Sequence, residues 1–260
     1  MSAFEKVAAA RAKGRPTGMD FINSLFDDFV EMHGDRRFAD DKAVVAGIAR
    51  LDGMPVTVVA LEKGHDTKEK ISRNFGSAHP EGYRKALRQM RLAEKFGRPV
   101  VCFVDTSGAY CGIAAEERGQ GQAIAENLME MMTLRVPVIS VLIGEGGSGG
   151  ALALAVADEV WMLENAVYSV ISPEGCASIL WKDSSKIKEA AECLKLTAED
   201  LYDLGVIEKI ISEYGKDFPK TCQELRRGLC AAFAENRALS PDELVKKRYG
   251  RFRRIGAEGK

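Results

Sequence analysis

Residues 143–151 read IGEGGSGGA, and this glycine cluster is the part of the chain best suited to chemistry. It lies between an apolar run and an alanine-rich run, which predicts a strand, a glycine turn and a helix. Glycine lets backbone approach a ligand closely, and a helix start offers unpaired N–H groups and the positive end of its dipole. The pattern therefore indicates an oxyanion site, although a glycine cluster can also serve only to pack a helix tightly on a sheet.

Three other glycine motifs align with the same residues, and each conflicts with the rest of the chain. The dinucleotide fingerprint expects an acidic residue about 20 positions further on, and Asp158 and Glu159 come too early. A nucleophile elbow at Ser148 needs a later histidine, whereas all three histidines precede it. A P-loop needs lysine after its last glycine, and the residue after Gly149 is another glycine.

Charged and hydroxyl side chains form a second group of candidates. Basic residues gather before and within a helix expected over residues 81–96: Lys68, Lys70, Arg73, Arg84, Lys85 and Arg88. They suit phosphates or carboxylates of a substrate or partner, and a solvated helix face is an equally supported alternative. Ser148 and Ser172 are interpreted as loop and cap hydroxyls. Glu145 and Glu174 are interpreted as carboxylates that favour a helix start rather than as general bases.

Alternating strands and helices are expected to position these residues. Residues 43–51 and 55–61 read as strands joined by a hairpin at Asp52-Gly53, so the chain is expected to open with an antiparallel pair. Strands over 99–104 and 137–143 each run into a glycine loop. Because parallel α/β sheets bind ligands at the carboxyl ends of their strands, the two loops are expected to share a site. Other predicted strands are 159–163, 167–171 and 206–211, and other predicted helices are 114–134, 184–194, 197–203, 219–235 and 240–248, with one more starting at residues 172–174.

Composition narrows the classes of protein. Of the 260 residues 46% are hydrophobic, which supports one large domain, with a core over about residues 16–212 and a helical segment over 217–250. The 37 basic and 38 acidic residues argue against a nucleic acid or membrane partner. The basic tail over residues 246–254 is interpreted as a solvated helix or a subunit contact.

Six cysteines without a C-x-x-C pair predict reduced thiols and no metal site. The first fifteen residues lack the apolar region of a signal peptide, and no apolar run is long enough to span a bilayer. A cytoplasmic protein is therefore expected.

Three motifs, in order, carry a family resemblance: residues 105–110 (DTSGAY), 144–151 (GEGGSGGA) and 168–181 (YSVISPEGCASILW). Shorter matches lie at residues 67–70, 74–76 and 80–86. Over roughly residues 16–212 the chain resembles the carboxyltransferase alpha subunit of bacterial acetyl-CoA carboxylase.

The resemblance implies an α/β fold of the crotonase/ClpP-like kind, a superhelix of ββα turns. It implies a biotin-dependent transferase that moves a carboxyl group from carboxybiotin to acetyl-CoA, giving malonyl-CoA for fatty-acid synthesis. Biotin would be carried on a separate carrier protein, and no metal is expected in this chain. The implied partners are a beta subunit in a heterotetramer of two alpha and two beta chains, the biotin carboxyl carrier protein and biotin carboxylase.

The chemistry of the implied reaction suggests roles for residues. Backbone amides around the catalytic glycines would hold the ureido oxygen of biotin: Gly146, Gly147, Gly149 and Gly150. The predicted substrate-binding residues are Gly108, Ala109, Tyr110, Lys68 and Arg84. The thioester would be held mainly by the beta subunit, and no protein base would be required.

Several features depart from the family pattern, and other functions compete. The N-terminal region is short, Ser107 and Cys111 stand where proline is common, and residues 212–219 lack a glycine- and histidine-containing loop. The rivals are a carboxyltransferase or decarboxylase for another acyl-CoA, a hydratase or isomerase acting alone, and a non-catalytic scaffold subunit. A peptidase of the ClpP kind is excluded because no histidine follows residue 79.

Overall fold

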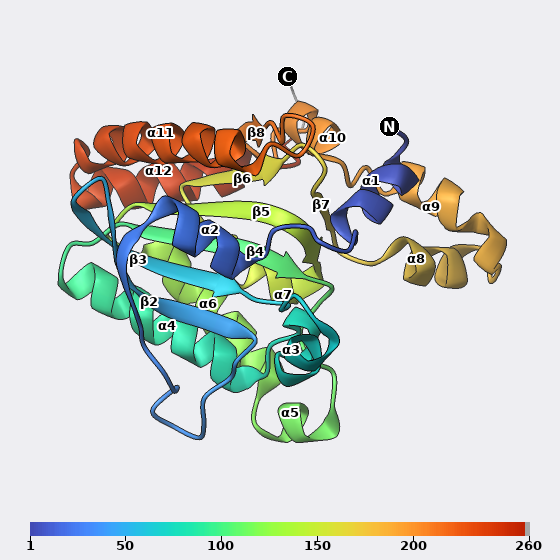
Figure 1. The fold of residues 1–260 in the computed structure, drawn as a ribbon, viewed down its shortest axis with the longest axis horizontal. Coiled ribbons are helices and arrows are strands. Elements are labelled where there is room, and N and C mark those ends of the chain that lie inside the picture. Colours follow the sequence, from blue (N-terminus) through green and yellow to red (C-terminus); the bar gives the residue numbers. More distant parts are fainter. Residues whose placement is uncertain (258–260) are drawn as a thin grey trace.

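The fold is built on a mixed, mostly parallel β-sheet (Figure 1). The computed structural model describes residues 1–257. Among these residues the strand order is β1-β2-β3-β4-β5-β6-β8, and β7 pairs with the end of β5. The strands are β1 (Asp27–Glu31), β2 (Val44–Leu51), β3 (Met54–Leu61), β4 (Val100–Thr106), β5 (Val138–Gly147), β6 (Glu159–Leu163), β7 (Val167–Ser169) and β8 (Lys209–Ile211).

The first three strands are antiparallel and the others run parallel. β2 and β3 turn at Asp52-Gly53, which confirms the predicted hairpin. The expectation that this pair opens the chain is wrong, because two helices and β1 precede it: α1 (Ala3–Ala10) and α2 (Gly18–Leu25). Their short lengths and the mixed polarity of β1 gave too weak a periodic signal.

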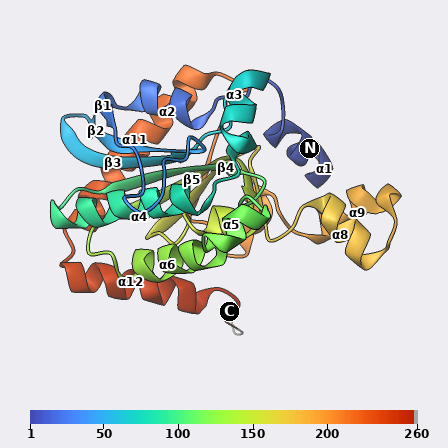
Figure 2. The same ribbon diagram turned by 90° about the horizontal axis from the view of Figure 1, so that it is seen from below.

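Helices cover both faces of the sheet (Figure 2). α4 (Pro80–Lys95) packs on β2, β3 and α6 (Gln120–Thr133), while α2 and α11 (Phe218–Arg237) pack on the other side. The one helix predicted over residues 114–134 is two, because Gly119 has a left-handed φ of 80° and separates α5 (Ile113–Glu117) from α6. The last helix, α12 (Pro241–Arg254), extends past residue 248 and takes in the basic tail. One continuous core runs from Phe21 to Phe233.

An arm projects from the sheet at the carboxyl end of β5 (Figures 1 and 2). It consists of α8 (Pro173–Leu180), a short 3-10 turn, η2 (Ser184–Lys186), and α9 (Ile187–Cys193). Ser172 caps α8 by accepting a hydrogen bond from the Gly175 amide, as the sequence predicts. α1 fixes the arm to the body through a small apolar cluster: Ala3, Val7 and Ala10 with Val167, Ala191 and Leu196.

The remaining helices are short and lie at or near the carboxyl ends of strands. They are α3 (Thr67–Ser72), the 3-10 turn η1 (Asn74–Gly76), α7 (Ser148–Leu152) and α10 (Ala198–Asp203). No helix within residues 1–257 has the length and apolar character needed to cross a bilayer.

Candidate active site

Two backbone segments meet where β4 and β5 end. The strands are parallel, and Thr106 pairs with Gly146. β5 extends through Gly147, so the first half of the predicted glycine turn is strand. The turn itself is brief: Ser148 takes a left-handed φ of 52°, and α7 begins there.

The glycines allow these segments to approach each other closely. A Cβ atom on Gly147 would overlap the carbonyl group of Ser107, and one on Gly150 would lie 2.5 Å from the amide nitrogen of Ala109. Gly149 differs, because its Cβ would meet nothing closer than 3.7 Å. Close packing therefore explains Gly147 and Gly150, and it also brings the amides of the two segments to one place.

Some of these amides are already engaged. The Gly108 N–H donates to the Thr106 hydroxyl at 3.1 Å, and that hydroxyl donates to the Gly108 carbonyl at 2.8 Å. The Ala109 N–H has no acceptor within residues 1–257. The first N–H groups of a helix such as α7 have no intrahelical acceptor. A cavity of about 50 Å³ lies against Gly146, Gly147 and Ser148, so the segment faces open space.

A cluster of ion pairs joins the strand ends next to the glycine segment. The ammonium of Lys63 contacts the carboxylates of Asp105 at 2.7 Å and Glu145 at 2.9 Å. Asp105 also accepts a hydrogen bond from the Glu145 N–H at 2.8 Å. Burial lowers the pKa of Lys63, but the two carboxylates more than offset it and raise the pKa above its usual value. The ends of β3, β4 and β5 are thereby tied together.

Arg11 links the same cluster to the arm. Its guanidinium contacts Glu145 at 2.6 Å and Glu174, in the first turn of α8, at 2.7 Å. Burial raises the pKa of Glu145, but Lys63 and Arg11 together hold it below its usual value. Arg11 likewise lowers the pKa of Glu174. Both carboxylates are therefore ionised ion-pair partners, which supports the interpretation that neither is a general base.

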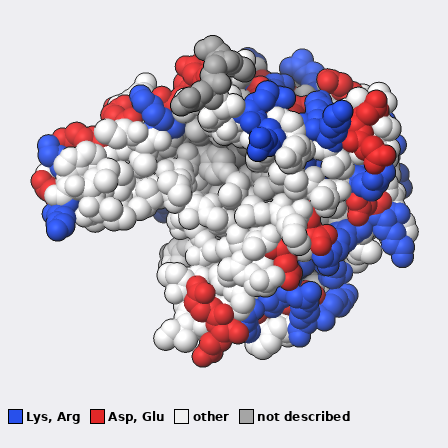
Figure 3. Space-filling view, turned by 180° about the vertical axis from the view of Figure 1, so that it is seen from behind, with Lys and Arg blue, Asp and Glu red and all other residues white. Residues whose placement is uncertain are grey.

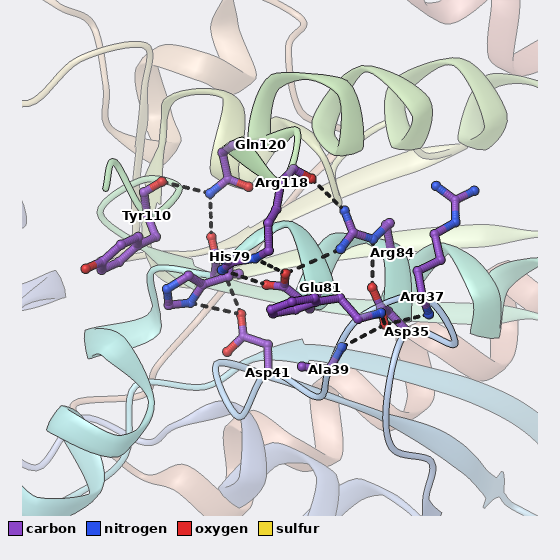
Figure 4. Close-up of polar contacts among 12 residues, drawn as sticks. Asp35, Arg37, Ala39, Asp41, His79, Glu81, Arg84, Tyr110, Arg118 and Gln120 are labelled. Atoms are coloured by element: carbon purple, nitrogen blue, oxygen red, sulfur yellow. Dashed lines mark hydrogen bonds and ion pairs between the residues drawn. The ribbon is translucent and has the colours of Figure 1, made fainter. Parts of the chain in front are cut away.

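Tyr110 directly follows the segment from Ser107 to Ala109 and belongs to a loop held by hydrogen bonds (Figure 4). Its ring stacks on His79 with centroids 4.1 Å apart, and its N–H donates to the Ala78 carbonyl at 3.0 Å. The Gln120 amide donates to the carbonyls of Ala78 and Tyr110, each at 2.8 Å. This loop is thus held in place before any ligand arrives.

The two predicted cationic ligands have different surroundings. Lys68 is exposed on α3 and makes no ion pair within residues 1–257. The side chain of Arg84 extends from α4 (Figure 4), contacts Asp35 at 2.7 Å and Glu81 at 3.4 Å, and donates to the Arg118 carbonyl at 3.0 Å. Because its donors are used internally, the geometry favours a positioning role for Arg84 over direct contact with substrate.

Sequence reasoning missed the contributions of Arg11, Lys63 and His79. Arg11 lies in a segment too short for a clear helix pattern, and Lys63 follows a strand with no motif around it. Their partners are 134 and 82 residues away, so no local spacing signals them. Residues 1–257 contain no group of His, Cys, Asp and Glu side chains that suits a metal ion.

Solved structures with this fold include carboxyltransferases. The core subunit of transcarboxylase 12S, solved with methylmalonyl-coenzyme A bound, aligns with a TM-score of 0.72 at 22% identity, covering 87% of this chain and 42% of that one. Structures of this group have crotonase-like folds, which confirms the predicted fold class.

Sequence comparisons cover nearly the whole chain. The acetyl-CoA carboxylase carboxyltransferase alpha subunit of Ruminiclostridium cellulolyticum is 69% identical over 256 residues, 98% of each chain. A Clostridium tetani protein described as carboxyl transferase subunits beta/alpha is 55% identical over 98% of this chain and 45% of its own length. A family model described as acetyl co-enzyme A carboxylase carboxyltransferase-like matches residues 1–256. The chain therefore belongs to the family of acetyl-CoA carboxylase carboxyltransferase alpha subunits.

Proposed function

We propose that the glycine segment at the end of β5 is the biotin-facing half of a carboxyltransferase site. In this reaction a carboxyl group passes from biotin, carried on a separate carrier protein, to acetyl-CoA, and malonyl-CoA forms. The observation that carries the proposal is the close approach of Gly147 and Gly150 to the segment from Ser107 to Ala109, beside a cavity. The chain's membership of the family supports the same reaction.

The chemistry requires donors for a developing negative charge. Biotin, when bound, would supply the carboxyl group, and negative charge would develop on its ureido oxygen as that group leaves, with the proton lost from the acetyl methyl group passing to the ureido group as the new carbon–carbon bond forms. The Ala109 N–H and the first N–H groups of α7, around Gly149 and Gly150, are donors of the right kind for that oxygen. Gly146 and Gly147 bring the backbone to the point of contact, and Gly108 shapes the opposite wall because Thr106 occupies its amide.

The ion pairs serve the site by fixing its walls. Lys63 and Arg11 hold Glu145, whose backbone leads into the glycine segment. Because both cations contact the Glu145 carboxylate, its negative charge opposes the anion that the amides are to stabilise less than an unpaired carboxylate would. Tyr110 and the exposed Lys68 are proposed as contacts for the rest of the substrate.

A beta subunit is proposed to complete the site from the side of the arm. Figure 3 shows an uncharged hollow between the arm and the body. Large apolar side chains are exposed on and beside the arm, with Val170 77% and Ile179 68% exposed. Apolar surface of this kind marks an interface. We further propose assembly as two alpha and two beta chains, with the biotin carboxyl carrier protein and biotin carboxylase as the other partners.

The test compares three glycines in the intact complex. The chain is co-expressed with its beta subunit, and acetyl-CoA formation from malonyl-CoA and free biotin is measured. Gly147→Ala and Gly150→Ala should each lower kcat by about 10²–10³ while KM for biotin changes little, because they displace donors that act in the transition state. Gly149→Ala is the matched control and should retain activity, since its Cβ has room.

Two outcomes would overturn the proposal. Full activity of Gly147→Ala or Gly150→Ala in a complex of normal assembly and stability would remove the role of this segment. Hydration of an enoyl-CoA by the chain without its partner would instead support a hydratase.

A further inference from the structure

We propose that a groove along α4 binds a phosphorylated small molecule. The groove has a cavity volume of about 470 Å³ and lies between α4, α6 and the loop over residues 34–40. Six cationic side chains line it: Arg36, Arg37, Arg84, Arg88, Arg91 and Lys95. In Figure 3, Lys and Arg side chains gather at the lower right, on the side of the molecule where α4 lies.

Three of these six cationic side chains have a carboxylate partner. Arg84 is paired with Asp35 and Glu81, and Arg91 contacts Glu130 at 2.7 Å. Arg37 is weakly paired, with 3.9 Å to a carboxylate oxygen of Glu126. Asp35 and Asp40 are near Arg88 but form no ion pair with it. The three cations of the groove without an ion pair within residues 1–257, namely Arg36, Arg88 and Lys95, are therefore the ones available to a ligand.

Arg36 and Arg88 form the centre of the available charge. Arg88 donates to the carbonyls of Gly34 at 3.1 Å and His33 at 3.0 Å, and the side-chain oxygen of Gln89 accepts from its Nη2 and Nη1 at 2.9 and 3.0 Å when the Gln89 amide is oriented to satisfy both groups. Arg88 makes no ion pair within residues 1–257. The side chain of Arg36 makes neither a hydrogen bond nor an ion pair within residues 1–257, and its Nη1 nitrogen lies 3.8 Å from where a Cβ of Gly34 would be. Both guanidinium groups therefore converge on Gly34.

Two like charges at one place are unfavourable unless an anion joins them. Burial, followed by the nearby charge of Arg36, lowers the pKa of Arg88 below its usual value. A phosphate group between the two would accept hydrogen bonds from both, since guanidinium donors match its oxygens in pairs.

The loop that presents Arg36 is built in advance. The buried carboxylate of Asp35 accepts hydrogen bonds from the N–H groups of Arg37, Phe38 and Ala39 at 2.9, 2.7 and 3.1 Å (Figure 4). Arg36 itself has a left-handed φ of 65°, a conformation that costs energy in a residue other than glycine. Backbone strain in a rigid loop that gives its side chain no internal partner is consistent with a ligand contact.

The lining also indicates the kind of molecule. Leu87 and Leu92 add an apolar part to the cationic wall, and the volume lies in the range of small-molecule pockets, about 300–1,000 Å³. The ligand chemistry is therefore phosphate joined to a less polar group. Two sources share this chemistry, namely the phosphate end of a coenzyme A thioester and a free nucleotide-like effector.

Calorimetry on the chain in complex with its beta subunit tests the site, with inorganic pyrophosphate and adenosine 3′,5′-bisphosphate as probes. The unsubstituted complex should bind one of them, more weakly at higher salt. Arg36→Ala should weaken binding by about tenfold or more. Arg36 is exposed and its side chain makes no hydrogen bond or ion pair within residues 1–257, so Arg36→Ala should fold normally. Arg88→Lys is a second variant and should also weaken binding. Arg253→Ala is the matched control, with less than a twofold change expected because Arg253 is an exposed residue of α12 that does not line the groove.

Kinetics then separate the two sources. A raised KM for malonyl-CoA in Arg36→Ala would assign the groove to the thioester, whereas an unchanged KM with lost probe binding would assign it to a separate effector. Either result supports a phosphate site and neither depends on the glycine segment. The proposal would be refuted if the unsubstituted complex bound neither probe. It would also be refuted if Arg36→Ala and Arg88→Lys both bound the probe as tightly as the unsubstituted complex.

Discussion

Arg248 of α12 is predicted to be a main determinant of stability. Its side chain is 0% exposed and contacts the Asp158 carboxylate through two nitrogens at 2.9 and 2.8 Å. It also donates to the carbonyls of Met131, Leu134 and Val136 at 2.8, 2.7 and 3.0 Å. One side chain therefore joins the last helix to the end of α6 and the start of β5.

The cost of Arg248→Ala follows from what it leaves behind. Asp158 would remain as a buried carboxylate with the Val138 N–H at 2.8 Å as a remaining partner, and three buried carbonyls would each lose a donor. Breaking a buried ion pair from one side costs about 3–5 kcal/mol. At about 2–4 °C per kcal/mol for a chain near this size, Tm should fall by about 6–20 °C.

Thermal and urea unfolding followed by circular dichroism measure this effect. Arg253→Ala is the control on the same helix, because Arg253 is exposed and makes no ion pair within residues 1–257; its change should stay within about 0.5 kcal/mol. A loss below about 1 kcal/mol for Arg248→Ala would refute the reasoning, since it would mean that the buried carboxylate finds other compensation.

Two further predictions concern titration and thiol reactivity. Burial raises the pKa of Asp40, but the Lys85 ammonium at 2.6 Å and the Gly34 N–H lower it to about 2. The Asp40–Lys85 pair should therefore stabilise the fold above pH 4 and lose this effect as the pH falls towards 2. Asp40→Asn should therefore lower the urea midpoint at pH 6 and have little effect near pH 2; a difference independent of pH would contradict this. Burial raises the pKa of the Cys102 thiol to about 12, whereas Cys111 and Cys193 are exposed. With DTNB at pH 8, the exposed pair should react first and Cys102 only after unfolding, and early labelling of Cys102 would show that the core opens.

The parts of the fold that sequence predicts well are those with strong local patterns. The Asp52-Gly53 hairpin, the cap at Ser172 and the strand over residues 159–163 lie where expected, since turn residues and apolar runs determine them locally. α1 and β1 were missed because they are short and gain their stability from distant partners, in the case of α1 from Val167 and Leu196.

For the candidate site, sequence predicts that the two glycine loops lie together but not the contacts that support them. The glycine segment does lie beside residues 107–109, as two loops at neighbouring strand ends must. The difference in space around Gly147 and Gly149 could not be predicted, because it depends on which atoms an added Cβ would meet at each position. The burial of Arg248 was also unpredictable, since a basic tail has the same composition whether it is solvated or packed against a distant aspartate.

The continuation of β5 into the glycine segment has a consequence for dynamics. β5 is bordered by β4 and β6 along its length and by β7 at its end, so residues 138–147 belong to the most tightly bonded part of the sheet. Amides of such a strand exchange with solvent only through large-scale opening, whereas those of the projecting arm exchange through small local fluctuations. The backbone of residues 138–147 should therefore belong to the slowest-exchanging unit of the protein. The proposed donors, the Ala109 N–H and the first N–H groups of α7, lie directly beside this rigid strand, so they would need almost no rearrangement when charge develops in front of them.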